Sequence, residues 1–161
     1  LGLIGIRGPS WLYDVRWSKP ALLLMSVWGA GGNMLIFLGG LQAIPTQLYE
    51  AATIDGAGTV RRFFSVTIPM MSPTLFFVLV TDVIGSFQVF TNAYIMTAGG
   101  PNNSTLMYVL YLYNLAFKQF RFGFASALAW VFFLIMMVFT VMLFRSSAAW
   151  VYYEGEIGGR R

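Results

Sequence analysis

Two long stretches without a charged residue limit what this sequence can fold into. Residues 21–40 and 122–144 are predominantly apolar and carry no Asp, Glu, Lys or Arg. A helix needs about 20 apolar residues to cross a hydrocarbon core about 30 Å thick. Charged residues make up only 10% of the chain, against about 25% in soluble domains. The sequence therefore predicts an all-α integral membrane protein.

Hydropathy predicts about three transmembrane helices in the chain. Their approximate bounds are 21–41, 70–90 and 122–144. The second contains an acidic residue, and Pro69 and Pro73 are expected at its start, where a helix tolerates proline. All three belong to one transmembrane domain that includes the whole of 1–161.

A shorter apolar run, 106–117, lies between the second and third spans. It contains three tyrosines, which favour the boundary between water and lipid. We predict a short interfacial helix there, within a loop over 91–121. A fourth span is the alternative.

A polar segment, about 45–68, separates the first two spans. Pro45 at its start and Gly56 and Gly58 within it predict two short helices with a break between them. The first of these is expected at about 47–55.

Composition also excludes several kinds of chemistry. The chain has no cysteine and no histidine, so disulfides, thiolate nucleophiles, histidine acid–base catalysis and the usual zinc sites are excluded. A phosphate-binding loop needs Lys followed by Ser or Thr, but Lys19 and Lys118 are followed by Pro and Gln. We predict no catalytic residue, no metal and no cofactor in this chain, and no binding of nucleic acid.

The polar segment also carries a spaced motif, EAATIDGAGTVRRFFSVTIP, over residues 50–69. It resembles the EAA motif of binding-protein-dependent ABC importer permeases. Val66 and Ile68 replace the usual Ile and Leu, which are conservative changes. The matching residues are Glu50, Ala51, Ala52, Gly56 and Pro69.

The resemblance extends to carbohydrate permeases along most of the chain. It includes residues 37–52, the GGP turn at 99–101 and the FGFASALAW segment at 122–130. It implies a core of six spans, of which this stretch corresponds to the last three. The chain begins with Leu1 rather than Met, so we expect it to be the C-terminal half of a longer permease.

Orientation follows from the resemblance and not from charge, because five basic residues lie on each side of the predicted spans. In the family the motif loop is cytoplasmic, in a bacterial inner membrane. Residues 1–19 and 91–121 are then external and the tail 146–161 is cytoplasmic.

The resemblance implies that this loop couples the permease to its ATPase. Small alanines would let a short helix seat closely in a groove, and Gly56 would permit a sharp reversal. The two arginines could instead anchor the loop at the membrane surface. The predicted coupling residues are Glu50, Ala51, Ala52, Asp55, Gly56, Arg61, Arg62 and Pro69.

Asp82 is the one acidic residue expected inside a span. Because a buried charge in a membrane is costly, we expect Asp82 to face water or the protein interior. Gln88 and Asn92 follow at helical spacing and, with Asp82, are candidates for a substrate path. The alternative for each is a structural hydrogen bond to a neighbouring helix.

The partners implied by the resemblance are cytoplasmic ABC ATPase subunits, a second permease subunit and an external solute-binding protein. The resemblance also implies that the transported substrate is a sugar and that ATP is bound by the partner subunits. The alternative function is a fragment of an ion-coupled secondary transporter or channel, which would use Asp82 as its intramembrane ionisable group.

Overall fold

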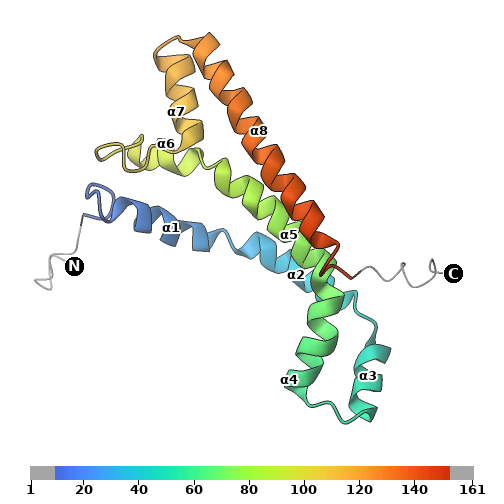
Figure 1. Ribbon diagram of the computed structural model, residues 1–161. Coiled ribbons are helices and arrows are strands. Elements are labelled where there is room, and N and C mark those ends of the chain that lie inside the picture. Colours follow the sequence, from blue (N-terminus) through green and yellow to red (C-terminus); the bar gives the residue numbers. More distant parts are fainter. Residues whose placement is uncertain (1–9, 153–161) are drawn as a thin grey trace, which may run out of the picture. The chain divides into compact units, whose positions relative to one another are not determined.

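The computed structural model describes residues 10–152, and all regular secondary structure in this part of the chain is helical (Figure 1). Two short π-helical turns lie at Phe63–Thr67 and Asn114–Lys118. The α-helices are α1 (Ser18–Trp28), α2 (Gly31–Gln42), α3 (Thr46–Ile54), α4 (Thr59–Arg62), α5 (Ile68–Phe87), α6 (Thr91–Thr97), α7 (Tyr108–Tyr113) and α8 (Phe122–Ser147).

Two helical stretches of the described chain are long and apolar enough to cross a membrane, namely Thr59–Thr97 and α8. A third candidate arises if α1 and α2 count as one broken span. The break falls at Gly29 and Ala30, directly before two further glycines. Glycine stabilises a helix interior poorly, so the expected continuous helix over 21–41 is interrupted there. The predicted all-helical membrane fold is confirmed.

The two prolines lie inside a continuous helical run and not in its first turn. The helical run begins at Thr59, so Pro69 and Pro73 both lie inside it. The π turn before Pro69 widens the helix, with the Ile68 N–H bonded to the Phe63 carbonyl. Pro73 cannot donate to the Pro69 carbonyl, and the hydroxyl of Ser72 donates to it instead, at 2.6 Å. A membrane helix tolerates proline when a side chain satisfies the freed carbonyl in this way.

The described chain divides into two compact units. The first contains residues 10–30 and 84–136, and its buried core is formed by Leu22, Ala93 and Leu110. The second contains residues 31–83 and 137–152, where Phe76 packs edge-on against Phe144 and Trp150. Helices α5 and α8 each contribute to both units.

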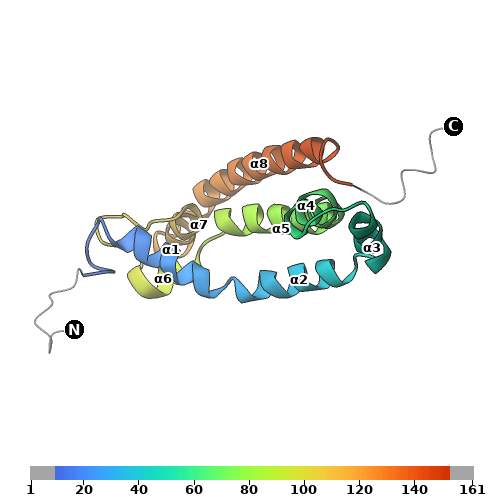
Figure 2. The ribbon, with the colours of Figure 1, turned by 90° about the horizontal axis from the view of Figure 1, so that it is seen from below.

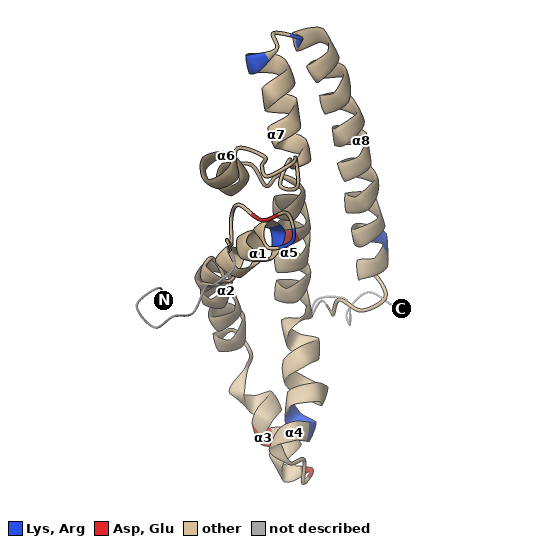
Figure 3. Ribbon diagram, turned by 90° about the vertical axis from the view of Figure 1, so that its left-hand side faces the viewer, with Lys and Arg blue, Asp and Glu red and all other residues tan. Residues whose placement is uncertain are grey.

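Helix α8 presents an almost continuous apolar surface. Only 6% of the residues in its most apolar 18-residue stretch are buried. Arg145, in the last turn, is the single charged residue of α8, all of which the structure describes. Figure 3 shows α8 uncharged along the rest of its length. Such a surface requires lipid or another apolar helix as its surroundings.

Candidate functional site

The motif segment forms a helical hairpin made of α3 and α4, which lie side by side (Figures 1 and 2). The expected helix over 47–55 is observed as α3, and Asp55 is its C-terminal cap. Gly56 follows with a φ of +73°, a left-handed conformation that residues with a Cβ adopt only at a cost. The predicted reversal at Gly56 is therefore present, and the Ala57 N–H closes it by bonding the Ala52 carbonyl.

Side-chain hydrogen bonds join the two arms of the hairpin. Arg62 donates from Nη1 to the Thr53 hydroxyl oxygen at 2.9 Å. The Tyr49 and Thr67 hydroxyls lie 2.9 Å apart and share a hydrogen bond. Arg62 therefore contributes to the internal structure of the hairpin, whereas the side chain of Arg61 is exposed.

The outer surface of the hairpin combines charge with apolar side chains. Glu50, Asp55 and Arg61 are exposed, and Figure 3 shows residues of both signs on the hairpin. Ala51 is exposed and Ala52 half-buried, so the two alanines of the motif differ in how much surface they offer. The exposed apolar residues are Leu48, Ile54, Val60, Phe63 and Phe64.

A shallow groove of about 430 Å³ runs along α3. Its lining residues are Thr46, Tyr49, Glu50, Thr53, Ile54 and Arg62. A hairpin with a groove, exposed aliphatic side chains and mixed charge is suited to docking another protein. Pro69 lies outside the α3–α4 hairpin. It is half-buried in α5, the helix that follows the hairpin, and is part of that helix instead of the docking surface.

Asp82 has a partner that sequence reasoning missed. The Asn33 side-chain amide donates to both carboxylate oxygens of Asp82, at 3.1 and 2.9 Å. Asp82 is exposed and Asn33 half-buried. This matches the structural alternative, a hydrogen bond to a neighbouring helix. The sequence contained a signal for it, because Asn33 and Ser26 are the strongly polar side chains of the first predicted span.

The helical relationship among the three substrate-path candidates is wrong. Helix α5 ends at Phe87, and α6 begins only at Thr91. Gln88 lies in the break and Asn92 in the next helix, so the three residues do not share one uninterrupted α-helix. Both side chains are exposed.

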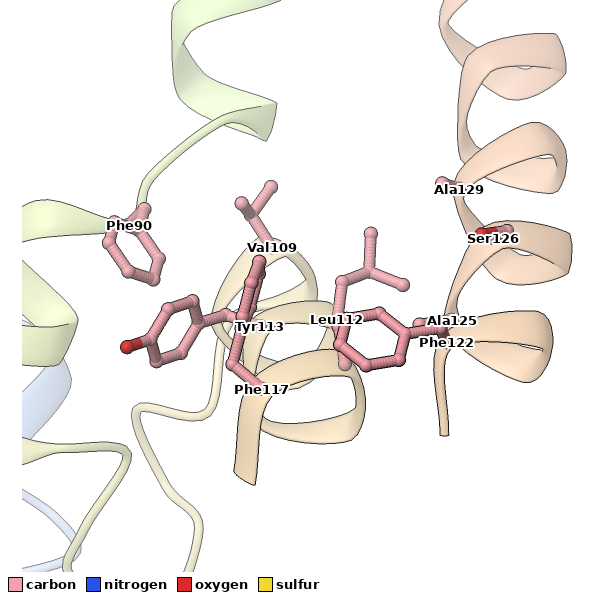
Figure 4. Close-up of a pocket in the computed structure, with 10 residues that line it drawn as sticks. Phe90, Val109, Leu112, Tyr113, Phe117, Phe122, Ala125, Ser126 and Ala129 are labelled. Atoms are coloured by element: carbon pink, nitrogen blue, oxygen red, sulfur yellow. The ribbon is translucent and has the colours of Figure 1, made fainter. Parts of the chain in front are cut away.

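The first unit contains an apolar pocket of about 410 Å³ between α7 and α8 (Figure 4). Leu112, Phe117 and Phe122 line it, and its polar groups are few, Tyr113 and Ser126 among them. Hydroxyl-rich ligands require several converging polar groups. The pocket therefore suits an apolar side chain or acyl chain better than a sugar.

An aromatic cluster adjoins this pocket. The Phe90 and Tyr94 rings stack with centroids 5.2 Å apart, and Tyr113 packs edge-on against both. A hydrogen bond with Tyr94, and the charge interaction with it, raise the pKa of the Tyr113 hydroxyl above its usual value of 10.0. The stacked rings of Phe90 and Tyr94 are thus both engaged in contacts within the protein.

The segment 106–117, predicted as a short helix, is observed as α7 and the π turn that follows it.

The sequence matches the family model described as "Binding-protein-dependent transport system inner membrane component" over residues 2–151. It is 49% identical over 137 residues to the probable ABC transporter permease protein YesP of Bacillus subtilis, covering 84% of this chain and 44% of YesP. It is 38% identical over 146 residues to the sulfoquinovosyl glycerol transport system permease SmoG of Agrobacterium fabrum (90% and 47% of the two chains). It is 40% identical over 150 residues to the lactose transport system permease LacF of Rhizobium radiobacter (89% and 50%). The chain thus spans about half the length of the curated relatives it matches.

Proposed function

Because this chain belongs to the family of inner-membrane components of binding-protein-dependent transport systems, we propose that it is part of the membrane subunit of an ATP-driven importer. In this proposal its helices form part of the translocation path together with a second permease subunit. Cytoplasmic ATPase subunits supply the energy, and an external solute-binding protein delivers the substrate.

The α3–α4 hairpin carries this proposal. It is braced internally by the Arg62–Thr53 and Tyr49–Thr67 hydrogen bonds, so a force on its tip is passed to the helix that follows. That helix is continuous from Thr59 through α5. The exposed surface around Ala51 would contact the ATPase, and movement of the ATPase would then move α5.

The charged groups of the hairpin have distinct proposed roles. Glu50 and Asp55 are exposed and offer carboxylates to basic groups of the ATPase. Arg61 offers the opposite charge on the same hairpin, while Arg62 fixes its geometry. In this proposal the coupling surface faces the cytoplasm and residues 91–121 are external, as the resemblance of the motif loop implies.

A sugar is the proposed substrate. Several relatives are named as permeases for carbohydrates or their derivatives, including lactose, sulfoquinovosyl glycerol and arabinooligosaccharides. Asp82 is bonded to Asn33 and the pocket of Figure 4 is apolar, so neither is proposed as the site of sugar recognition.

The coupling role is tested by site-specific crosslinking. The full-length subunit is reconstituted in nanodiscs with its second permease and with ATPase subunits freed of reactive cysteines. Single cysteines replace Ala51 or, as the control in the loop 91–121 that is proposed to be external, Gln119, and a short bifunctional reagent is added. Ala51→Cys is expected to crosslink to the ATPase with a yield that changes with ATP, and Gln119→Cys is not. An assembled, ATP-hydrolysing complex without crosslinks from Ala51→Cys would refute the coupling role.

The substrate class is tested separately, by ATPase stimulation. The same complex, with its solute-binding protein, is presented with lactose, an arabinooligosaccharide and sulfoquinovosyl glycerol, and with an amino acid mixture as the control. Stimulation by at least one sugar and not by amino acids is expected. The reverse pattern would exclude a sugar importer while leaving the coupling role intact.

A further inference from the structure

The contacts between α2 and α5 continue those of the α3–α4 hairpin. Four pairs join the two arms: Thr53 with Arg62, Tyr49 with Thr67, Gly40 with Thr74 and Asn33 with Asp82. The members of each pair are nearly equidistant in sequence from the turn at Ala57 and Gly58. Residues 33–82 therefore form one long antiparallel helical hairpin, and all of it lies in a single compact unit.

The brace furthest from the turn is polar. Both carboxylate oxygens of Asp82 accept from the Asn33 amide, which fixes the rotation of both helices as well as their spacing. Interhelical hydrogen bonds of this kind hold helices together in lipid, where no hydrophobic force does so. Figure 2 shows α2 running beside α5 along this part of the unit.

The face that α2 turns to α5 is narrow, because only Asn33, Phe37 and Gly40 of this helix are half-buried. In α2, all of whose residues the structure describes, no residue is fully buried. Leu35, Leu38 and Met34 are 72, 50 and 73% exposed. A close approach occurs at Gly40, where an added Cβ would lie 2.7 Å from the Thr74 hydroxyl oxygen. A polar contact at Asn33 and a steric one at Gly40 thus both lie on the narrow face that α2 turns to α5.

We propose that the Asn33–Asp82 pair is a positioning clamp that makes α2, the coupling hairpin and α5 move as one lever. This inference rests on the proposed coupling role of the hairpin and names the residues that carry its motion into the membrane. Asp82 acts in it through Asn33 and not by contact with the substrate. With the clamp intact, a displacement of the hairpin rotates both helices together. Without the clamp, the same displacement moves α5, and α2 no longer moves by the same amount.

The inference is tested by measuring the separation of α2 and α5 in the complete transporter. Spin labels are attached to cysteines at Ile36 and Leu79, exposed positions near the clamp. The chain has no cysteine of its own, and the partners are freed of theirs. Distances are recorded in nanodiscs without nucleotide and after trapping with ATP and vanadate, together with the ATPase rate.

The expected result is one narrow distance that does not change with trapping. Asn33→Ala and Asp82→Ala should each broaden it, and the double variant should be no broader than either. The exchanged pair, Asn33→Asp with Asp82→Asn, again places a donor opposite an acceptor and should restore the narrow distance. Thr81→Ala is the matched control, because the Thr81 hydroxyl bonds only carbonyls of its own helix, those of Phe77 and Val78.

The coupling readout is the change in Ala51→Cys crosslinking between the two states. Loss of either clamp residue should reduce this ATP-dependent change by about fivefold or more, the lower end of typical coupling free energies, and the exchanged pair should recover most of it. A distance that changes on trapping in the unmodified protein, or an exchanged pair that behaves like the single variants, would overturn the clamp. If the clamp is overturned but Ala51→Cys still crosslinks to the ATPase, the coupling role of the hairpin stands. If Ala51→Cys gives no crosslinks in the complex with Asn33 and Asp82 intact, both the coupling role and the clamp are refuted.

Discussion

The hydroxyl of Tyr49 in α3 lies 2.9 Å from that of Thr67, in the π turn that leads into α5. Thr67 is buried at 6% exposure, so this bond ties the hairpin to the interior of its unit. Tyr49→Phe should cost about 1 kcal/mol, since one hydrogen bond is lost and the Thr67 hydroxyl is left without its partner. Hydrogen–deuterium exchange over residues 46–67 should rise. Ser65→Ala is the control, because that hydroxyl bonds its own helix at the Arg61 carbonyl. Equal exchange in both variants would contradict the role given to Tyr49.

Gly56 should be the glycine of the hairpin that resists substitution. At a φ of +73°, a Cβ costs about 1–2 kcal/mol, although the space around it is open. Gly56→Ala should therefore lower the melting temperature of the complex and the crosslinking yield from position 51. Gly58→Ser should do neither, because Gly58 has an ordinary φ of −66° and is the N-cap of α4, a position where serine is preferred. Gly56→Asn should lie in between, since asparagine tolerates the left-handed region. If Gly58→Ser proved equally damaging, backbone strain would not be the reason.

Gly40 is expected to be sensitive for a different reason, which is close packing. A Cβ there would meet the Thr74 hydroxyl oxygen at 2.7 Å, so Gly40→Val should force α2 away from α5. Gly39→Val faces open space and serves as the control. Thr74→Gly should relieve much of the damage in the double variant, as expected for two residues in direct contact. The melting temperature of the reconstituted complex measures all three. Failure of Thr74→Gly to compensate would place the steric conflict elsewhere.

The two arginines should respond differently to removal. Arg62→Gln loses the bond to Thr53 and should raise hydrogen exchange within the hairpin. Arg61→Gln removes an exposed charge and should leave exchange unchanged while weakening association with the proposed ATPase partner. Because exposed charges are screened by salt, that weakening should shrink at high ionic strength. Co-purification of the ATPase at low and high salt measures it. Identical behaviour of the two variants would favour membrane anchoring for both.

Tyr108 should stabilise the packing of α7 on α8 in the first unit. Its hydroxyl donates to the Leu128 carbonyl at 2.9 Å, and its ring stacks on Phe132 with centroids 5.0 Å apart. Tyr108→Phe keeps the ring and should cost about 0.5–1.5 kcal/mol, seen as faster exchange in residues 108–118. Tyr111→Phe is the control, because Tyr111 is 37% exposed. No difference between the two would mean that the bond to Leu128 contributes nothing measurable.

Local patterns were sufficient for the helical elements and for the hairpin. The helix α3 and the reversal at Gly56 follow from residues close together in sequence, because capping, glycine geometry and turn chemistry act over a few positions. The helix ends near residue 90 were less predictable. Gln88, Thr91 and Asn92 lower the hydropathy after Phe87, but no proline or glycine lies between Phe87 and Thr91 to mark a break in the helix. The expected helical spacing to Asn92 was therefore wrong.

The sequence by itself determined that this chain is a helical membrane protein, because about 20 uncharged apolar residues in a row have no other suitable solvent than lipid. It also determined the family, through the spaced motif at 50–69. Only the tertiary structure showed which side chain Asp82 bonds to. Asn33 lies 49 residues away, and which polar groups meet across two helices depends on their rotation and register, which short-range propensity does not encode. The same holds for Gly40 and Thr74, whose contact exists only once α2 has packed against α5.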